Sequence, residues 1–136
     1  MSRSGYSDDT EDQWAFICWR GAVASAIRGR RGQLLLTELL AALDAMPEKQ
    51  LIAEELERDG QFCTLGVLGH QRGISMESID PEDYDQVAKA FGIANALAQE
   101  IEFMNDDFWR SETTERRWTR MRAWVAAQIT KAPNEN

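Results

Sequence analysis

Residues 33–46 read QLLLTELLAALDAM, and this stretch decides the fold class of the chain. Its leucines recur at the three- and four-residue steps that place side chains on one face of an α-helix: Leu35, Leu36, Leu39, Leu40 and Leu43. Pro47 follows and ends the pattern. The stretch predicts an amphipathic helix over 33–46 in an all-α domain.

The segment before it predicts a more apolar helix. Between Asp12 and Arg28 the apolar side chains surround the helix axis: Trp14, Phe16, Ile17, Cys18, Trp19, Val23 and Ile27. Because a helix that is apolar all round is usually buried, we expect 12–28 to be the central helix. Gly21, Ala22 and Ser25 would let a neighbouring helix approach closely. The run RGRRG at 28–32 predicts the end of this helix, with a left-handed glycine cap.

Downstream patterns bring the expected number of helices to about seven. A short helix is predicted around Leu51 and Leu56, ending at Asp59-Gly60. Residues 61–72 permit a strand, but the spacing of their glycines favours a closely packed helix. Asp80-Pro81-Glu82-Asp83 predicts a helix start, with Asp80 as its cap and Gly92 as its end. Further helices are expected over 93–105 and after a cap at Thr113 or Thr114.

The chain of 136 residues suits one domain. We expect a flexible acidic arm over 1–11, a compact helical domain over 12–131 and a tail over 132–136.

Cys18 and Cys63 have apolar neighbours, which predicts buried reduced thiols and a reducing compartment. No apolar run is long enough to span a bilayer, and the first residues lack a signal-peptide core. These features predict a cytoplasmic location and no membrane partner.

Charge is distributed unevenly along the chain, whose net charge is -8. Residues 33–109 contain 4 Lys/Arg and 16 Asp/Glu, whereas both ends carry a small excess of Lys/Arg. An acidic middle favours basic partners and disfavours nucleic acid and anionic membranes.

Two acidic groups in this middle region are the predicted partner-binding residues. They are Glu54, Glu55, Glu57 and Asp59, and Asp80, Glu82, Asp83 and Asp85. If folding gathers them on one face, they would engage a host protein that has a basic surface or a nucleic-acid groove. A solvated acidic surface that keeps a small protein in solution explains the same residues.

Two other kinds of site are weaker predictions. A nucleic-acid site would use the two arginine clusters, Arg28, Arg30, Arg31, Arg116, Arg117 and Arg120. Pairing of these arginines with the acidic middle makes nucleic-acid binding the less favoured alternative. A magnesium enzyme would use the oxygens of Glu102, Asn105, Asp106 and Asp107, but no dedicated ligand spacing accompanies them and a solvated, capped helix end is the favoured explanation. We therefore predict no catalytic residue, no metal and no cofactor.

Four stretches of the chain resemble a known family. They are WRGAVASAIRGRRGQ at 19–33, LLAALDAMP at 39–47, DPED at 80–83 and RWTRMRAW at 117–124. The family comprises small proteins encoded by tailed bacteriophages and prophages of Gram-negative bacteria, and the resemblance covers nearly the whole chain. It brings no assigned activity or catalytic residues. It implies a phage protein that works in the cytoplasm of a bacterial host.

These observations lead to one main hypothesis. We expect a non-enzymatic phage accessory protein that binds and inhibits a host defence or nucleic-acid-processing protein, of the anti-CRISPR or anti-defence type, through an acidic helical surface. Self-association is a further expectation, since the Trp and Leu residues exceed what one small core needs. The alternatives are a small nucleic-acid-binding accessory protein and a carboxylate-metal enzyme.

Overall fold

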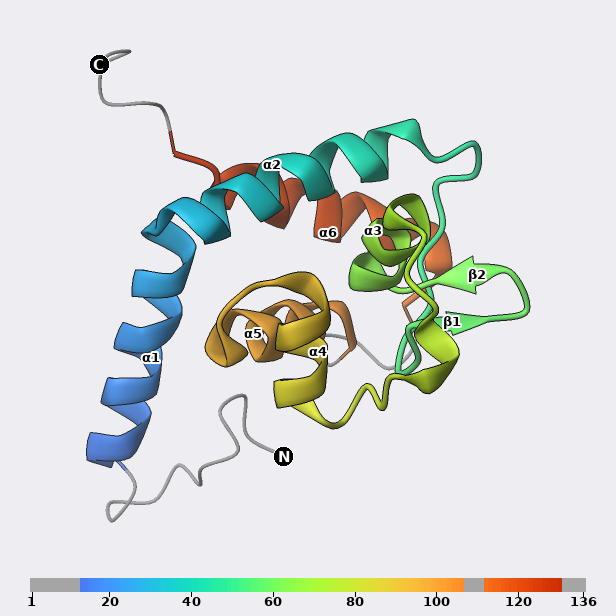
Figure 1. The fold of residues 1–136 in the computed structure, drawn as a ribbon. Helices are drawn as coiled ribbons and strands as arrows, with labels where there is room; N and C mark the ends of the chain where they lie inside the picture. The colour runs from blue at the N-terminus through green and yellow to red at the C-terminus, as the bar shows by residue number, and fades with distance from the viewer. Residues whose placement is uncertain (1–12, 107–111, 131–136) are drawn as a thin grey trace.

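A computed structural model describes residues 13–106 and 112–130 (Figure 1). In this part of the chain there are six α-helices, a short 3-10 helix and one two-stranded sheet. The elements in chain order are α1 (Gln13–Arg28), α2 (Arg30–Ala45), β1 (Glu57–Arg58), β2 (Gln61–Phe62), α3 (Thr64–Arg72), η2 (Met76–Ser78), α4 (Tyr84–Phe91), α5 (Asn95–Asp106) and α6 (Thr114–Gln128). The expected all-α class is confirmed, with six α-helices rather than about seven. The predicted arm at 1–11 and tail at 132–136 lie outside the described residues.

Helix α2 organises the core, as its leucine pattern predicts. Its apolar face packs against α3 and α6, which lie beneath and behind it in Figure 1. Leu36, Leu39 and Leu43 are completely buried. Each such side chain contributes about 1.5–3 kcal/mol by leaving water, so burial of this face stabilises the fold by several kcal/mol.

Helix α1 is not the central helix that the sequence predicts. It forms one edge of the molecule, against α2 and α5 (Figure 1), and buries only Trp19 and Val23. Trp14 and Ile17 remain 74% and 58% exposed. A helix at an edge offers only one side to its neighbours, so an apolar surface all round cannot be covered there. Cys18 is exposed for the same reason, which contradicts the prediction that both thiols are buried.

The junction of α1 and α2 also differs from the prediction. Gly29 alone separates the helices, and its backbone is extended, with φ -67° and ψ 161°, rather than left-handed. Gly32 lies inside α2, where an added Cβ would sit 1.9 Å from the carbonyl oxygen of Ala26. Glycine at 32 therefore allows the two helices to meet at a tight corner.

The short helix predicted around Leu51 and Leu56 is absent. In its place β1 and β2 form an antiparallel hairpin, in which Arg58 pairs with Gln61. Asp59 and Gly60 both have positive φ, 52° and 77°, as a two-residue hairpin turn with the strand-matching twist requires. The Asp-Gly pair is thus a turn signal rather than a helix end. Helix α3 confirms the helical prediction for 64–72 but not for 61–62.

Helix α4 begins three residues later than the Asp80 cap predicts. The N-cap is Asp83, whose carboxylate accepts a hydrogen bond from the backbone N–H of Gln86. The Asp80 carboxylate instead accepts from the N–H of Glu82 at 2.9 Å, which turns the chain before the helix. Gly92 ends α4 in the left-handed conformation, and Thr113 caps α6, both as predicted.

Candidate functional site

A pocket of about 440 Å³ opens between four segments of the fold. They are the loop before β1, the start of α3, the loop that leads into α4 and the C-terminal half of α5. The lining residues are Glu54, Glu55, Leu56, Cys63, Leu65, Pro81, Glu82, Tyr84, Ile101, Glu102, Phe103, Asn105 and Asp106. Five of these described residues are carboxylic acids and none is Lys, Arg or His, so we call this feature the acidic pocket.

The floor of the acidic pocket is apolar. Leu56, Leu65 and Ile101 are buried side chains of the main core. Burial raises the pKa of the Cys63 thiol to about 12. Because the thiolate is the nucleophilic form, a thiol that stays protonated at neutral pH is chemically inert. Cys63 instead accepts a hydrogen bond from the N–H of Gly66 and caps α3.

Glu54 holds an uncommon backbone conformation at the rim of the pocket. Its φ is 74°, in the left-handed region that side chains other than glycine rarely adopt. Its N–H donates to the Asp106 carboxylate at 3.0 Å. This bond offsets part of the conformational cost and joins the loop before β1 to the end of α5.

Burial changes the ionisation of the carboxylates that line the inner wall. It raises the pKa of Glu102 to about 8, and the negative charges of Asp106 and Asp80 act in the same direction. It also raises the pKa of Asp106, although hydrogen bonds from Glu54 and Asn105 oppose that shift. Glu102 therefore keeps its proton at neutral pH. A cation in the pocket would favour release of that proton, because opposite charge stabilises the ionised form.

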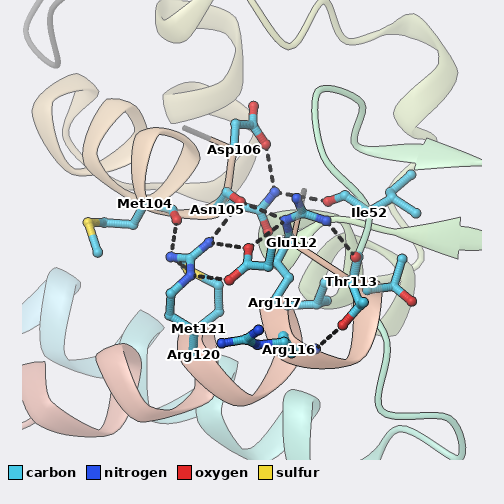
Figure 2. A network of polar contacts seen from close by, with 12 residues as sticks. Ile52, Met104, Asn105, Asp106, Glu112, Thr113, Arg116, Arg117, Arg120 and Met121 are labelled. Carbon is cyan, nitrogen blue, oxygen red and sulfur yellow. Dashed lines mark hydrogen bonds and ion pairs between the residues drawn. The ribbon is translucent and has the colours of Figure 1, made fainter. Parts of the chain in front are cut away.

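Asn105 joins the pocket wall to the polar network shown in Figure 2. Its Oδ1 accepts from the backbone N–H and the hydroxyl of Thr64, at 3.0 and 2.7 Å. Its Nδ2 donates to the carbonyl of Ile52 at 2.9 Å. A buried amide whose oxygen and nitrogen both form hydrogen bonds within the protein holds the fold together and is not free to bind a ligand.

The described residues give little support to the alternative magnesium site. Within 13–106 and 112–130, no group of three or more His, Cys, Asp or Glu side chains is placed to hold a metal ion. Asn105 is engaged by the protein itself. Asp107, the remaining residue of the predicted set, lies outside the described residues.

Two of the predicted nucleic-acid arginines lie in the same network. Arg117 is buried and donates to the backbone carbonyls of Asn105 and Leu51. Arg120 donates to both carboxylate oxygens of Glu112, at 2.6 and 2.8 Å, and to the carbonyl of Met104 (Figure 2). The guanidinium groups thus satisfy carbonyls at the C-terminal end of α5, where positive charge is favourable. Both arginines hold the fold together and are not available to phosphate.

The other four arginines of that set are exposed but do not form one surface. Arg28, Arg30 and Arg31 lie at the corner between α1 and α2, beside the C-terminal end of α6, where Gln33 donates to the Gln128 carbonyl. Arg116 lies at the opposite end of α6, about 20 Å away for a helix of this length. The two predicted arginine clusters are therefore separate.

The structure brings together part of the predicted acidic set. Glu54 and Glu55 from the first group and Glu82 from the second line the same pocket. Asp80 is close enough to influence the ionisation of Glu102. These residues come from segments about thirty positions apart in the sequence, which the fold places side by side.

The remaining predicted acidic residues lie elsewhere. Glu57 and Asp59 belong to the exposed hairpin. Asp83 is occupied as the cap of α4, and the Asp85 carboxylate accepts from the Asn95 side chain at 2.6 Å. None of these four residues lines the acidic pocket.

Sequence reasoning missed three members of the site. Tyr84 carried no signal, because one tyrosine at a helix start has many structural explanations. The sequence predicts Glu102 and Asp106 only as ligands of the alternative metal site. Their spacing of four residues places them on one helix face, and this is the signal that identifies them as neighbours.

No protein-family model, curated protein or solved structure matches the chain. Among the described helices, none combines the length and apolar character needed to cross a bilayer.

Proposed function

We propose that this protein is a non-enzymatic inhibitor that takes cationic side chains of another protein into the acidic pocket. One observation carries the proposal: carboxylates from three separate segments converge on a single hollow whose described lining contains no basic residue. Guanidinium and ammonium groups form strong charge-assisted hydrogen bonds with such carboxylates. The apolar floor would contact the aliphatic part of an arginine or lysine side chain.

The protein's own cations support this proposal because they are paired away from the pocket. Arg20 pairs with Glu100, Arg72 with Glu38, Arg120 with Glu112 and Arg122 with Asp44. Among the described ion pairs, only the one between Glu55 and Arg58 involves a pocket carboxylate, and both of its side chains are largely exposed. Neither Glu54 nor Glu82 takes part in an ion pair of the described residues, so their charges remain for a partner to neutralise.

The proposed partner is a host defence protein or a nucleic-acid-processing protein. Such proteins hold the phosphate backbone in grooves rich in Lys and Arg. An acidic protein seated there would exclude the nucleic acid. The resemblance to phage-encoded proteins fits this role, since a phage gains from blocking a nuclease of the CRISPR type inside its host.

An arginine-rich peptide tests the pocket directly. Affinity would be measured by calorimetry for the parent protein and for the triple variant Glu54→Gln, Glu55→Gln, Glu82→Gln. The matched control is Glu57→Gln, Asp59→Asn, Glu77→Gln, which removes the same number of charges from exposed positions outside the pocket.

We expect the pocket variant to bind the peptide roughly tenfold or more weakly, because several charge-assisted contacts are lost together. The control should lose only the small effect of net charge. Equal losses in the two variants would mean that the pocket has no special part in binding, and the proposal would then be abandoned.

A further inference from the structure

The acidic pocket holds an aromatic ring among its carboxylates. Tyr84, the first residue of α4, lines the pocket and is partly buried. Burial raises the pKa of its hydroxyl, and the negative charges of Glu102, Asp106 and Glu82 act in the same direction. The tyrosine ring therefore lies close to carboxylates from two segments of the lining, the loop that leads into α4 and helix α5.

The carboxylates of the acidic pocket come from three segments of the chain. Glu102 and Asp106 lie one turn apart on α5, Glu54 belongs to the loop before β1, and Glu82 belongs to the loop before α4. A cation that engages all three segments needs hydrogen-bond donors that point in different directions. A guanidinium group has five N–H donors spread in one plane, whereas an ammonium group is a compact point charge.

A cation that reaches the inner wall must also give up part of its hydration. The floor beneath Glu102 and Asp106 is formed by the buried side chains of Leu56, Leu65 and Ile101. A guanidinium group is more weakly hydrated than an ammonium group, and it stays charged when it is buried. The cost of leaving water in this pocket is therefore lower for arginine than for lysine.

We propose that the acidic pocket selects arginine over lysine, with the guanidinium group stacked on the ring of Tyr84 and hydrogen-bonded to the surrounding carboxylates. This inference rests on the function proposed above, because it names the cationic side chain that the pocket takes. The face of an aromatic ring attracts a cation, and a planar guanidinium group stacks on it. An arginine that binds phosphate through two parallel hydrogen bonds can bind a carboxylate in the same way, so the captured side chain is a phosphate-binding arginine of the partner.

Calorimetry with two peptides tests this selectivity. The probes are an arginine-rich peptide and the same peptide with every arginine replaced by lysine, so that length and charge are equal. We expect the parent protein to bind the arginine peptide about tenfold more tightly, because a guanidinium group stacks better and loses less hydration. The variant Glu54→Gln, Glu55→Gln, Glu82→Gln should lose most of this preference, because the guanidinium group is no longer held in the pocket.

Variants of Tyr84 test the part played by the aromatic ring. Tyr84→Leu keeps an apolar side chain but removes the aromatic face, and it should reduce the preference for arginine by about two- to fivefold. Tyr84→Phe keeps the ring and should retain the preference. The matched control is Trp14→Leu, which removes an aromatic side chain that is 74% exposed on α1 and should leave the preference unchanged. Circular dichroism would verify that each variant keeps the helical content of the parent.

The failure of this inference can be distinguished from the failure of the proposed function. Equal affinity of the parent for the two peptides, with both weakened by the triple variant, would reject selectivity for arginine and leave the function proposed above. If the triple variant weakens neither peptide, binding in the pocket is rejected, and that function with it. A preference for arginine that persists in Tyr84→Leu would overturn the stacked arrangement.

Discussion

Glu112 pairs with the two arginines, Arg117 and Arg120, that join α6 to the carbonyls at the end of α5. Its side chain is 5% exposed and lies between Arg117 and Arg120, whose side chains are 8% and 18% exposed. The guanidinium of Arg120, which donates to it, holds the pKa of Glu112 below its usual value. A buried charge that loses its partner is strongly destabilising, because neither water nor another protein group replaces the lost interaction.

We therefore expect Glu112→Ala to lower the free energy of unfolding by about 3–5 kcal/mol, measured by urea denaturation. The control is Glu38→Ala, which removes a carboxylate that is 45% exposed and pairs with Arg72 on the surface. An exposed pair of this kind contributes less than about 1 kcal/mol. Similar losses in the two variants would contradict the structural role given to Glu112.

The raised pKa of Glu102 predicts that the free energy of unfolding falls as the pH rises. The folded chain keeps its proton up to pH about 8, whereas the unfolded chain releases it near the ordinary pKa of 4.5. Between these values the folded state binds more protons, so this group lowers the free energy of unfolding as the pH rises.

The substitution Glu102→Gln should remove this pH-dependent loss of stability, because glutamine does not titrate. We expect the variant to exceed the parent in stability by on the order of 5 kcal/mol above pH 8, and to match it below pH 4.5. Denaturation at both ends of this range is the measurement. Glu57→Gln, at an exposed position, should change stability equally at both ends; the same pH-dependent gain there would remove the explanation from Glu102.

At the scale of elements, two helical glycines illustrate opposite constraints. Gly66 lies in α3 against the chain before β1, and its Cβ would be 1.9 Å from the Leu56 carbonyl oxygen. Gly21 in α1 has open space. Replacement of glycine by alanine should thus change the free energy of unfolding in opposite directions at these two positions.

We expect Gly21→Ala to raise the free energy of unfolding by up to about 1 kcal/mol, since alanine is the better helix former. Gly66→Ala should lower it by about 1–3 kcal/mol or more, because a backbone group must move to admit the methyl group. Thermal and urea denaturation of dilute protein would measure both. A gain at Gly66 would mean that α3 and the segment before β1 are less closely packed than the structure has them.

The sequence predicts helices and their ends correctly where the local pattern of residues is strong. The leucines of α2, the cap at Thr113 and the stop at Gly92 are local signals, and the structure confirms them. The helix predicted before Asp59-Gly60 is wrong, because the few apolar residues of this segment fit a helical spacing by chance. Local propensity is a weak prior when a segment is short, and packing then decides.

At the scale of the whole molecule, the net charge of -8 and its concentration in residues 33–109 govern encounters with other molecules. Complementary charge speeds association and makes the rate fall with ionic strength. We expect the association rate with an arginine-rich peptide to fall about tenfold or more between low and physiological salt, while dissociation changes less. Stopped-flow fluorescence would measure both rates. A rate that does not depend on salt would contradict an electrostatic encounter.

The sequence by itself determined the helical class, the amphipathic α2 and the acidic character of the middle region, because periodicity and charge are properties of neighbouring residues. Only the tertiary structure decided that α1 lies at an edge, that Arg117 and Arg120 turn inward, and that Glu54, Glu82 and Glu102 share one pocket. These outcomes depend on contacts between residues far apart in the chain. Many packings satisfy the same local pattern, and the burial of α2 against α3 and α6 selects one of them.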